Sequence, residues 1–225
     1  MGVCISACGA QQSTQTGTAP SAAESTSSFS QAAGTPKESS AESSAPSEST
    51  SAGKSHILVA YFSQAGEQYN VGVVEKGNTQ IVAEMIAGET GADLFHIERK
   101  EAYPSTYNDL LSAAQDEMKN NSRPELSASV DGWDNYDTIF LGYPIWWGDM
   151  PMPVYTFLEN YDFTGKTVIP FDTNGGSGLA DTVSAITKAC PGATVKDGLA
   201  VSGKEAQTQQ DKARSEVLNW LKGLP

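Results

Sequence analysis

Residues 56–62 read HILVAYF, a short run of apolar and β-branched side chains. Continuous apolar runs of this length are typical of strands that are covered on both faces, as in a parallel sheet between two layers of helices. Because parallel strands need a long crossover, a helix should follow. Residues 78–87 fit that expectation, with Ile81 and Met85 on one helical face. The stretch therefore predicts the first strand and helix of an α/β domain.

The same alternation continues toward the C-terminus. Further strands are predicted at residues 93–97, 138–141, 167–171 and 194–201. Further helices are predicted at residues 105–121, 149–158 (with Asp149 as N-cap), 179–186 and 213–221. This order predicts a doubly wound α/β fold, with a five-stranded parallel sheet, right-handed crossovers and helices on both faces. Because proline cannot donate to the ladder, Pro170 argues against a central position for its strand unless it lies at the frayed end of that strand.

The N-terminal part has a different composition. Residues 11–54 consist mainly of Ser, Thr, Ala, Gly, Pro, Gln and Glu, with Phe29 as the only aromatic residue. Such a segment buries too little apolar surface to offset the entropy of ordering it, about 1–2 kcal/mol per residue. We therefore expect three parts: residues 1–10 as the remnant of a signal, residues 11–54 as a disordered tether, and residues 55–225 as the folded domain.

Residues 5–9, ISACG, resemble the lipobox of bacterial lipoproteins, in which Cys8 would be diacylated and become the mature N-terminus. A polar tether usually follows such a site. A secretory signal needs an apolar stretch of about 7–15 residues, more than residues 1–3 supply, so this interpretation expects the true start to lie upstream. It predicts an extracytoplasmic, membrane-anchored lipoprotein. Without the lipid, the protein is expected in the cytoplasm.

The chain is strongly acidic, with a formal net charge of −13. The first 55 residues contribute −2, which leaves −11 for the predicted domain. An acidic surface repels phosphate backbones, so we expect no nucleic-acid partner. It does suit association with basic proteins.

In a doubly wound sheet, ligands bind beyond the carboxyl ends of the strands, where the strand order reverses. The loop after the first strand begins with Ser63 and Gln64 and, after an excursion, reaches Asn78 and Thr79 at a helix start. Hydroxyl groups and the free amides of a helix N-terminus form an anion site. The loop lacks the lysine of a nucleoside-triphosphate P-loop.

The loop after the third strand is unusually apolar. It contains Pro144, Ile145, Trp146, Trp147 and Gly148. Loops are usually polar, so two adjacent indoles need a reason. A flat aromatic ligand supplies one, because stacking adds about 0.5–1.5 kcal/mol to area burial. We expect one indole to face such a ligand and the other to pack beneath the following helix.

The loop after the fourth strand is rich in glycine. It contains Thr173, Asn174, Gly175, Gly176 and Gly178, again before a predicted helix. Glycines let the backbone approach a ligand closely and present its N–H groups. Together with the other two loops, it predicts one ligand site.

Between His56 and about Gly203, the chain resembles the flavodoxin-like proteins. It is most similar to the single-domain, short-chain bacterial type with G-Y-P-x-W-W and T-x-G-G-S-G loops. The resemblance implies the strand order 2-1-3-4-5 and FMN as cofactor. It places Ser63, Gln64, Asn78 and Thr79 around the phosphate, residues 144–148 on one side of the isoalloxazine, and the five residues of the glycine loop on the other. Unlike the compact phosphate loop of the family, this one carries an insertion at residues 67–76.

The resemblance implies an electron-transfer protein with redox partner proteins. An alternative on the same fold is an NAD(P)H-dependent flavin or quinone oxidoreductase, with a small quinone or nicotinamide substrate. A third alternative is a lipid-anchored binding module without a redox role. Fold alone does not separate these functions.

Overall fold

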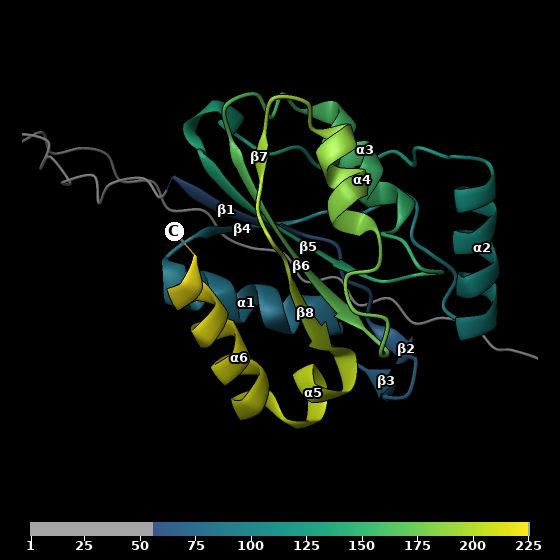
Figure 1. Ribbon diagram of the computed structural model, residues 1–225. Coiled ribbons are helices and arrows are strands. Elements are labelled where there is room, and N and C mark those ends of the chain that lie inside the picture. The colour runs from purple at the N-terminus through teal and green to yellow at the C-terminus, as the bar shows by residue number, and fades with distance from the viewer. Residues whose placement is uncertain (1–55, 225) are drawn as a thin grey trace, which may run out of the picture. The chain divides into compact units, whose positions relative to one another are not determined.

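The described part of the chain is a sheet between two layers of helices (Figure 1). This computed structural model describes residues 56–224, so the predictions for Cys8 and for the tether lie outside the described residues. The strands of the main sheet are β1 (Ile57–Tyr61), β4 (Asp93–His96), β5 (Thr138–Pro144), β6 (Thr167–Asn174), β7 (Thr194–Val195) and β8 (Leu199–Ser202).

The strand order is β4-β1-β5-β6-β7, with β8 also paired to β6, and these pairs are parallel. With β7 and β8 taken as two parts of the fifth strand, this is the predicted order 2-1-3-4-5, which is confirmed. The order reverses between β1 and β5, so a ligand site is expected beyond the carboxyl ends of these two strands.

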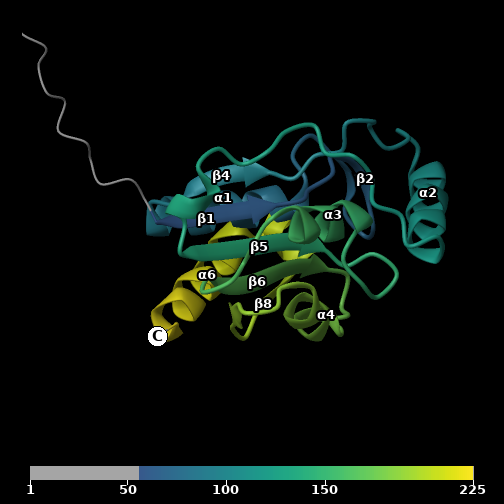
Figure 2. The ribbon, with the colours of Figure 1, turned by 90° about the horizontal axis from the view of Figure 1, so that it is seen from above.

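Helices cover both faces of the sheet. They are α1 (Asn78–Thr90), α2 (Tyr107–Lys119), α3 (Met152–Asn160), α4 (Thr182–Ala189), α5 (Gly203–Thr208) and α6 (Gln210–Gly223), with a 3-10 turn at Trp133–Asn135. On one face, Val59 and Phe171 pack with Val82 of α1 and Val217 of α6. On the other, Leu58 and Val168 pack with Phe157 of α3 and Ile186 of α4. Figures 1 and 2 both place α2 beyond the carboxyl ends of the strands.

Pro170 lies in a central strand, which the sequence argument had disfavoured. Lys196 donates to the carbonyl of Val168, so even-numbered residues of β6 face the fifth strand. Pro170 faces the same way, at the height where residues 196–198 interrupt the fifth strand between β7 and β8. Its missing donor therefore costs no ladder hydrogen bond, because the neighbouring strand is broken at that point.

Three local predictions were wrong. β5 and β6 extend to Pro144 and Asn174, so residues predicted as loop continue the ladder, with Pro144 in register with Thr173. Asp149 is not the N-cap of α3, because Pro151 takes that position. The Asp149 carboxylate instead accepts hydrogen bonds from the Met150 N–H and the Tyr155 hydroxyl.

A β-hairpin and helix α5 were not predicted from the sequence. The insertion at residues 67–76 contributes to an antiparallel hairpin of β2 (Gly66–Gln68) and β3 (Gly72–Val74), and α5 precedes the predicted last helix. Within residues 56–224, no helix has the length and apolarity to cross a membrane.

Candidate functional site

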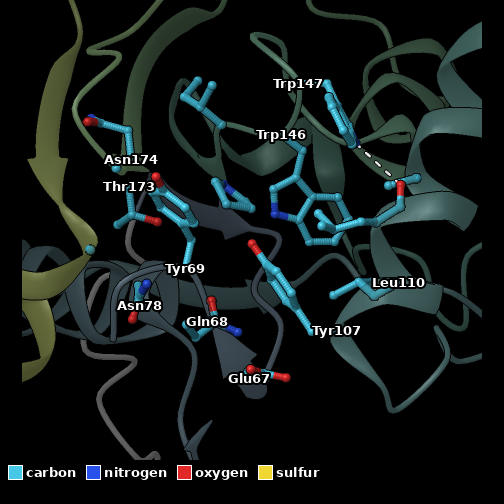
Figure 3. A pocket seen from close by; sticks show the side chains of 16 residues that line it. Glu67, Gln68, Tyr69, Asn78, Tyr107, Leu110, Trp146, Trp147, Thr173 and Asn174 are labelled. Atoms are coloured by element: carbon cyan, nitrogen blue, oxygen red, sulfur yellow. Dashed lines mark hydrogen bonds between the residues drawn. The ribbon is translucent and has the colours of Figure 1, made fainter. Parts of the chain in front are cut away.

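A cavity of about 350 Å³ opens beyond the carboxyl ends of β5 and β6 (Figure 3). Eight of the residues predicted from the sequence line it: Asn78, Pro144, Ile145, Trp146, Trp147, Thr173, Asn174 and Gly175. The hairpin, α2 and the start of α5 supply Glu67, Gln68, Tyr69, Tyr107, Leu110, Leu111, Ala114 and Gly203. The three predicted loops thus meet at one site.

The two halves of the first loop lie together although the insertion separates them in sequence. A Cβ on Gly77 would lie 2.3 Å from the Ser63 hydroxyl oxygen and 2.5 Å from the Gln64 carbonyl oxygen. Only glycine permits this approach. The insertion therefore leaves the loop as a hairpin without disturbing the contact between its ends.

Ser63 and Thr79 are not cavity-lining residues. The Ser63 hydroxyl accepts a 3.0 Å hydrogen bond from the Gln80 N–H and so caps the first turn of α1. The hydroxyl oxygens of Thr79 and Thr173 lie 2.8 Å apart, and both residues are buried. These bonds hold the start of α1 against both neighbouring loops. The Gln80 N–H is thereby satisfied, and the other N–H groups at the start of α1, with the helix dipole, are the ones that could hold an anion.

Asn78 supplies an unused polar group inside the site. Its Oδ1 atom is buried and has no hydrogen-bond partner among the residues that the structure describes. Gly203 leaves room for the side chain, since a Cβ there would lie 2.5 Å from the Asn78 Nδ2 atom. A buried acceptor without a partner costs about 1–3 kcal/mol, so a ligand that donates to it would be favoured.

The two indoles both line the cavity but have different environments. Trp146 is half-buried, and its ring makes edge contacts with Phe62 and Tyr103, each at a centroid distance of 5.4 Å. Trp147 is 53% exposed and has a φ of 54°. Its Nε1 atom donates a hydrogen bond to the Leu111 carbonyl oxygen, at a nitrogen–oxygen distance of 3.3 Å. Trp146 lies between residues of α2, such as Ala114, and the start of α3 at Met152. The Trp147 ring lies at the open edge of the cavity, where it is exposed to solvent. Gly148, with φ of 84°, turns the chain just outside the cavity.

The glycine loop is held by a short chain of hydrogen bonds. The Asn174 amide donates to the Asp172 carboxylate over 2.6 Å, and its Oδ1 atom accepts from the Gly176 N–H over 2.8 Å. Burial raises the pKa of Asp172 to about 7, although the bond from Asn174 acts in the opposite direction. Gly176 and Gly178, both with positive φ, shape this turn without lining the cavity. Gln64, the remaining predicted residue, does not line the main cavity. It lines a smaller cavity of about 190 Å³, which shares Glu67 and Tyr107 with the main one.

The lining residues of the hairpin and α2 were not predicted from the sequence. The hairpin had a signal in Asn70 and Gly72, which both take positive φ at its turn. The α2 residues gave no such signal, because their place over the site depends on tertiary contacts. The Tyr103 hydroxyl donates to Glu117 of α2, and Arg99 lies 3.2 Å from the same carboxylate.

The fold and the site together define a flavodoxin-like class of protein. Residues 56–221 match the sequence profile of the flavodoxin family. Since this match covers most of the chain, the protein belongs to the flavodoxin family.

Solved structures agree with this assignment. A protein of Bacteroides uniformis assigned as a flavoprotein has 31% sequence identity and a TM-score of 0.61, over 75% of this chain and 99% of that one. A similarly assigned protein of Bacteroides eggerthii has 32% identity and a TM-score of 0.55, over 70% and 96%. A flavoprotein of Lactobacillus acidophilus, solved in complex with FMN, has 26% identity and a TM-score of 0.51, over 69% and 96%. The comparison with curated proteins gives no match.

Proposed function

We propose that this protein binds FMN in the cavity beyond β5 and β6 and acts as an electron carrier between redox proteins. The observation that carries the proposal is that the start of α1, an aromatic loop and a glycine loop meet in one cavity, next to the point between β1 and β5 where the strand order reverses. FMN is the cofactor that family membership and the FMN-bound flavoprotein of Lactobacillus acidophilus support.

The residues present fit FMN. The start of α1 offers N–H groups to a phosphate, and the unpartnered Oδ1 atom of Asn78 suits a hydroxyl of the sugar chain. Ile145 and Trp147 offer apolar surface to a flat ring, and Gly175 lets backbone come close to it. A polar end and an apolar end are thus present in one cavity, as an amphipathic nucleotide requires.

Bound FMN supplies the redox chemistry, and the protein sets its conditions. The net charge of the predicted domain, −11, disfavours further negative charge in the site and so lowers the reduction potential. Glu67 at the cavity wall adds to this effect. The same acidity favours docking of basic redox partners, which it steers toward the acidic surface.

A reductase is the second candidate function. The observation that favours it is the apolar surface that α2 adds to the cavity. Leu110 and Leu111 extend the apolar lining beyond the three flavin loops, which gives a wall against which a flat acceptor such as a quinone could bind. We favour the carrier because the acidic surface suits protein partners and because the sequence offers no nicotinamide fingerprint.

Steady-state kinetics of the FMN-loaded full chain separate the two. For a carrier, we expect NADPH oxidation with a soluble quinone to stay below about 1 s⁻¹, the low end of ordinary enzymes. Electron transfer to a basic haem protein should be faster at low salt and should fall as ionic strength rises. Fast NADPH-driven quinone turnover, with no salt dependence toward the haem protein, would establish the reductase instead.

We also propose that Cys8 carries a lipid that anchors the domain to a membrane outside the cytoplasm. The support is the ISACG sequence at residues 5–9 and the polar stretch that follows. Expressed behind a lipoprotein signal, the protein should fractionate with membranes. Cys8→Ser should release it, and Cys4→Ser, the matched control, should not. Equal fractionation of both variants would contradict the proposal. Several acyl chains are expected, since a single one binds membranes only marginally.

A further inference from the structure

The two walls of the cavity differ in what they offer a flat ligand. The aromatic loop presents Ile145 and the two indoles, whereas the glycine loop presents backbone at Gly175. A ring bound between them would find side-chain surface on one side only. The hairpin changes this imbalance.

Tyr69 lies at the tip of the β2–β3 hairpin, and its ring covers Gly175. A Cβ on Gly175 would lie 2.8 Å and 3.0 Å from two ring carbons of Tyr69, so the ring rests directly on the glycine backbone. Tyr69 nevertheless remains 64% exposed. In Figure 3 it projects into the space between Thr173 and Trp146. An exposed aromatic ring that lines a cavity is surface available to a ligand.

The hairpin is tied to the rest of the site at both ends. The Gln68 amide donates to the Gln64 carbonyl over 2.9 Å, and the Gln207 amide of α5 donates to the Lys76 carbonyl over 2.6 Å. The first bond joins the hairpin to the loop at the start of α1. Gln68 is the residue before Tyr69, so this bond fixes the strand end from which the Tyr69 turn begins.

We propose that Tyr69 is a cofactor-binding residue, whose ring supplies the aromatic surface that the glycine loop lacks and contacts the flat ring of FMN. The inference rests on the proposed function, because it takes FMN as the ligand. It gives the insertion at residues 67–76 a role: the insertion carries an aromatic side chain across the site to the wall made of glycine. Gly175 is then needed to seat the Tyr69 ring.

The test is the dissociation constant of FMN, measured by fluorescence titration of the full-length apoprotein. Tyr69→Ala should raise the Kd about 3- to 10-fold and leave bound FMN less quenched, as the loss of one stacking ring predicts. Tyr69→Phe should keep the wild-type Kd, because the ring is retained. Val73→Ala is the matched control: Val73 lies on the same hairpin, is 84% exposed and does not line the cavity.

A double-mutant cycle tests the seat of the ring. Gly175→Ala should displace Tyr69 and weaken FMN binding in the wild-type background, yet add little to Tyr69→Ala, because contacting residues are not additive. Wild-type protein that binds FMN, with Tyr69→Ala and Val73→Ala binding equally well, would overturn this inference alone. A folded wild-type protein that binds no FMN would overturn the proposed function and this inference with it.

Discussion

The aromatic loop at residues 144–148 and the glycine loop at residues 173–178 face the same cavity but are built by different physics. The first is fixed by side-chain packing, with the Trp146 ring against Phe62 and Tyr103. The second is fixed by backbone conformation and by the hydrogen bonds of Asn174. Substitutions in the first should therefore act through lost contacts, and substitutions in the second through strain and polar bonding.

Of the substitutions in these two loops, Trp146→Ala should reduce stability the most. Trp146→Ala removes a half-buried indole from its contacts with Phe62 and Tyr103, and we expect the free energy of unfolding to fall by about 2–3 kcal/mol, below the 3–5 typical of a fully buried ring. Trp147→Ala, one residue on, is the control and should cost less than about 0.5–1 kcal/mol, since its ring is mostly exposed. Denaturant unfolding of the apoproteins measures both. Equal losses would mean that packing does not distinguish the two indoles.

In the glycine loop, the sensitive position is Gly176, with φ of +123°. A Cβ there meets no atom within 4 Å, so Gly176→Ala acts through backbone strain alone, and we expect a loss of about 1–3 kcal/mol. Gly88→Ala, inside α1 and equally unobstructed, should stabilise the fold by roughly 0.5–1 kcal/mol. Thermal unfolding of the two variants should shift in opposite directions. A neutral Gly176→Ala would show that the loop relaxes freely.

Asp172 makes the glycine loop sensitive to pH. Burial raises its pKa from 3.8 to about 7, so its contribution to stability is complete below about pH 4 and is lost as the pH rises through 7. Relative to Asp172→Asn, the wild type should therefore lose on the order of 1–2 kcal/mol between pH 5 and pH 8. Parallel profiles for the wild type and Asp172→Asn would contradict this account of the loop.

The smallest effect distinguishes Trp147 from an indole elsewhere in the fold. Trp147→Ala should weaken FMN binding by about 0.5–1.5 kcal/mol, because the exposed ring lines the cavity. Trp133→Ala should leave the FMN Kd unchanged, although it costs more stability, since Trp133 is buried against Phe157 and Phe163. Both are measured by FMN titration at a temperature where the variants are folded. Equal Kd changes would mean that the aromatic loop does not hold the ring.

Much of the fold could be predicted from the sequence, because the spacing of apolar residues shows which segments are buried strands and which are helices. The run at residues 56–62 and its counterparts predict the five strands, and the switch-point rule predicts where the loops meet. Local errors arose where tertiary context decides. Pro170 sits in a central strand only because β7 and β8 are interrupted beside it, which no local pattern reveals.

The parts of the site that could be predicted are loop residues of unusual type for a loop. The parts that could not be predicted are residues that only tertiary contacts bring to the cavity. Asn78, Trp147 and Gly175 stand out by residue type in their loops. Leu110 reads as an ordinary amphipathic helix residue, and its presence in the cavity depends on the contacts that hold α2 across the strand ends. Asn70 and Gly72 indicate a turn next to Tyr69. The contact of Tyr69 with Gly175 could not be predicted, because these residues are far apart in the sequence.

The central claim is that the meeting of these loops forms an FMN site, and titration of the folded, full-length apoprotein with FMN tests it most directly. We predict saturable one-to-one binding, with flavin fluorescence quenched by the aromatic side chains around the ring. Gly77→Ala, whose Cβ would push the start of α1 away from Ser63 and Gln64, should weaken that binding at least about tenfold. A folded wild-type protein that leaves FMN fluorescence unchanged, with no saturable binding by calorimetry, would contradict the claim.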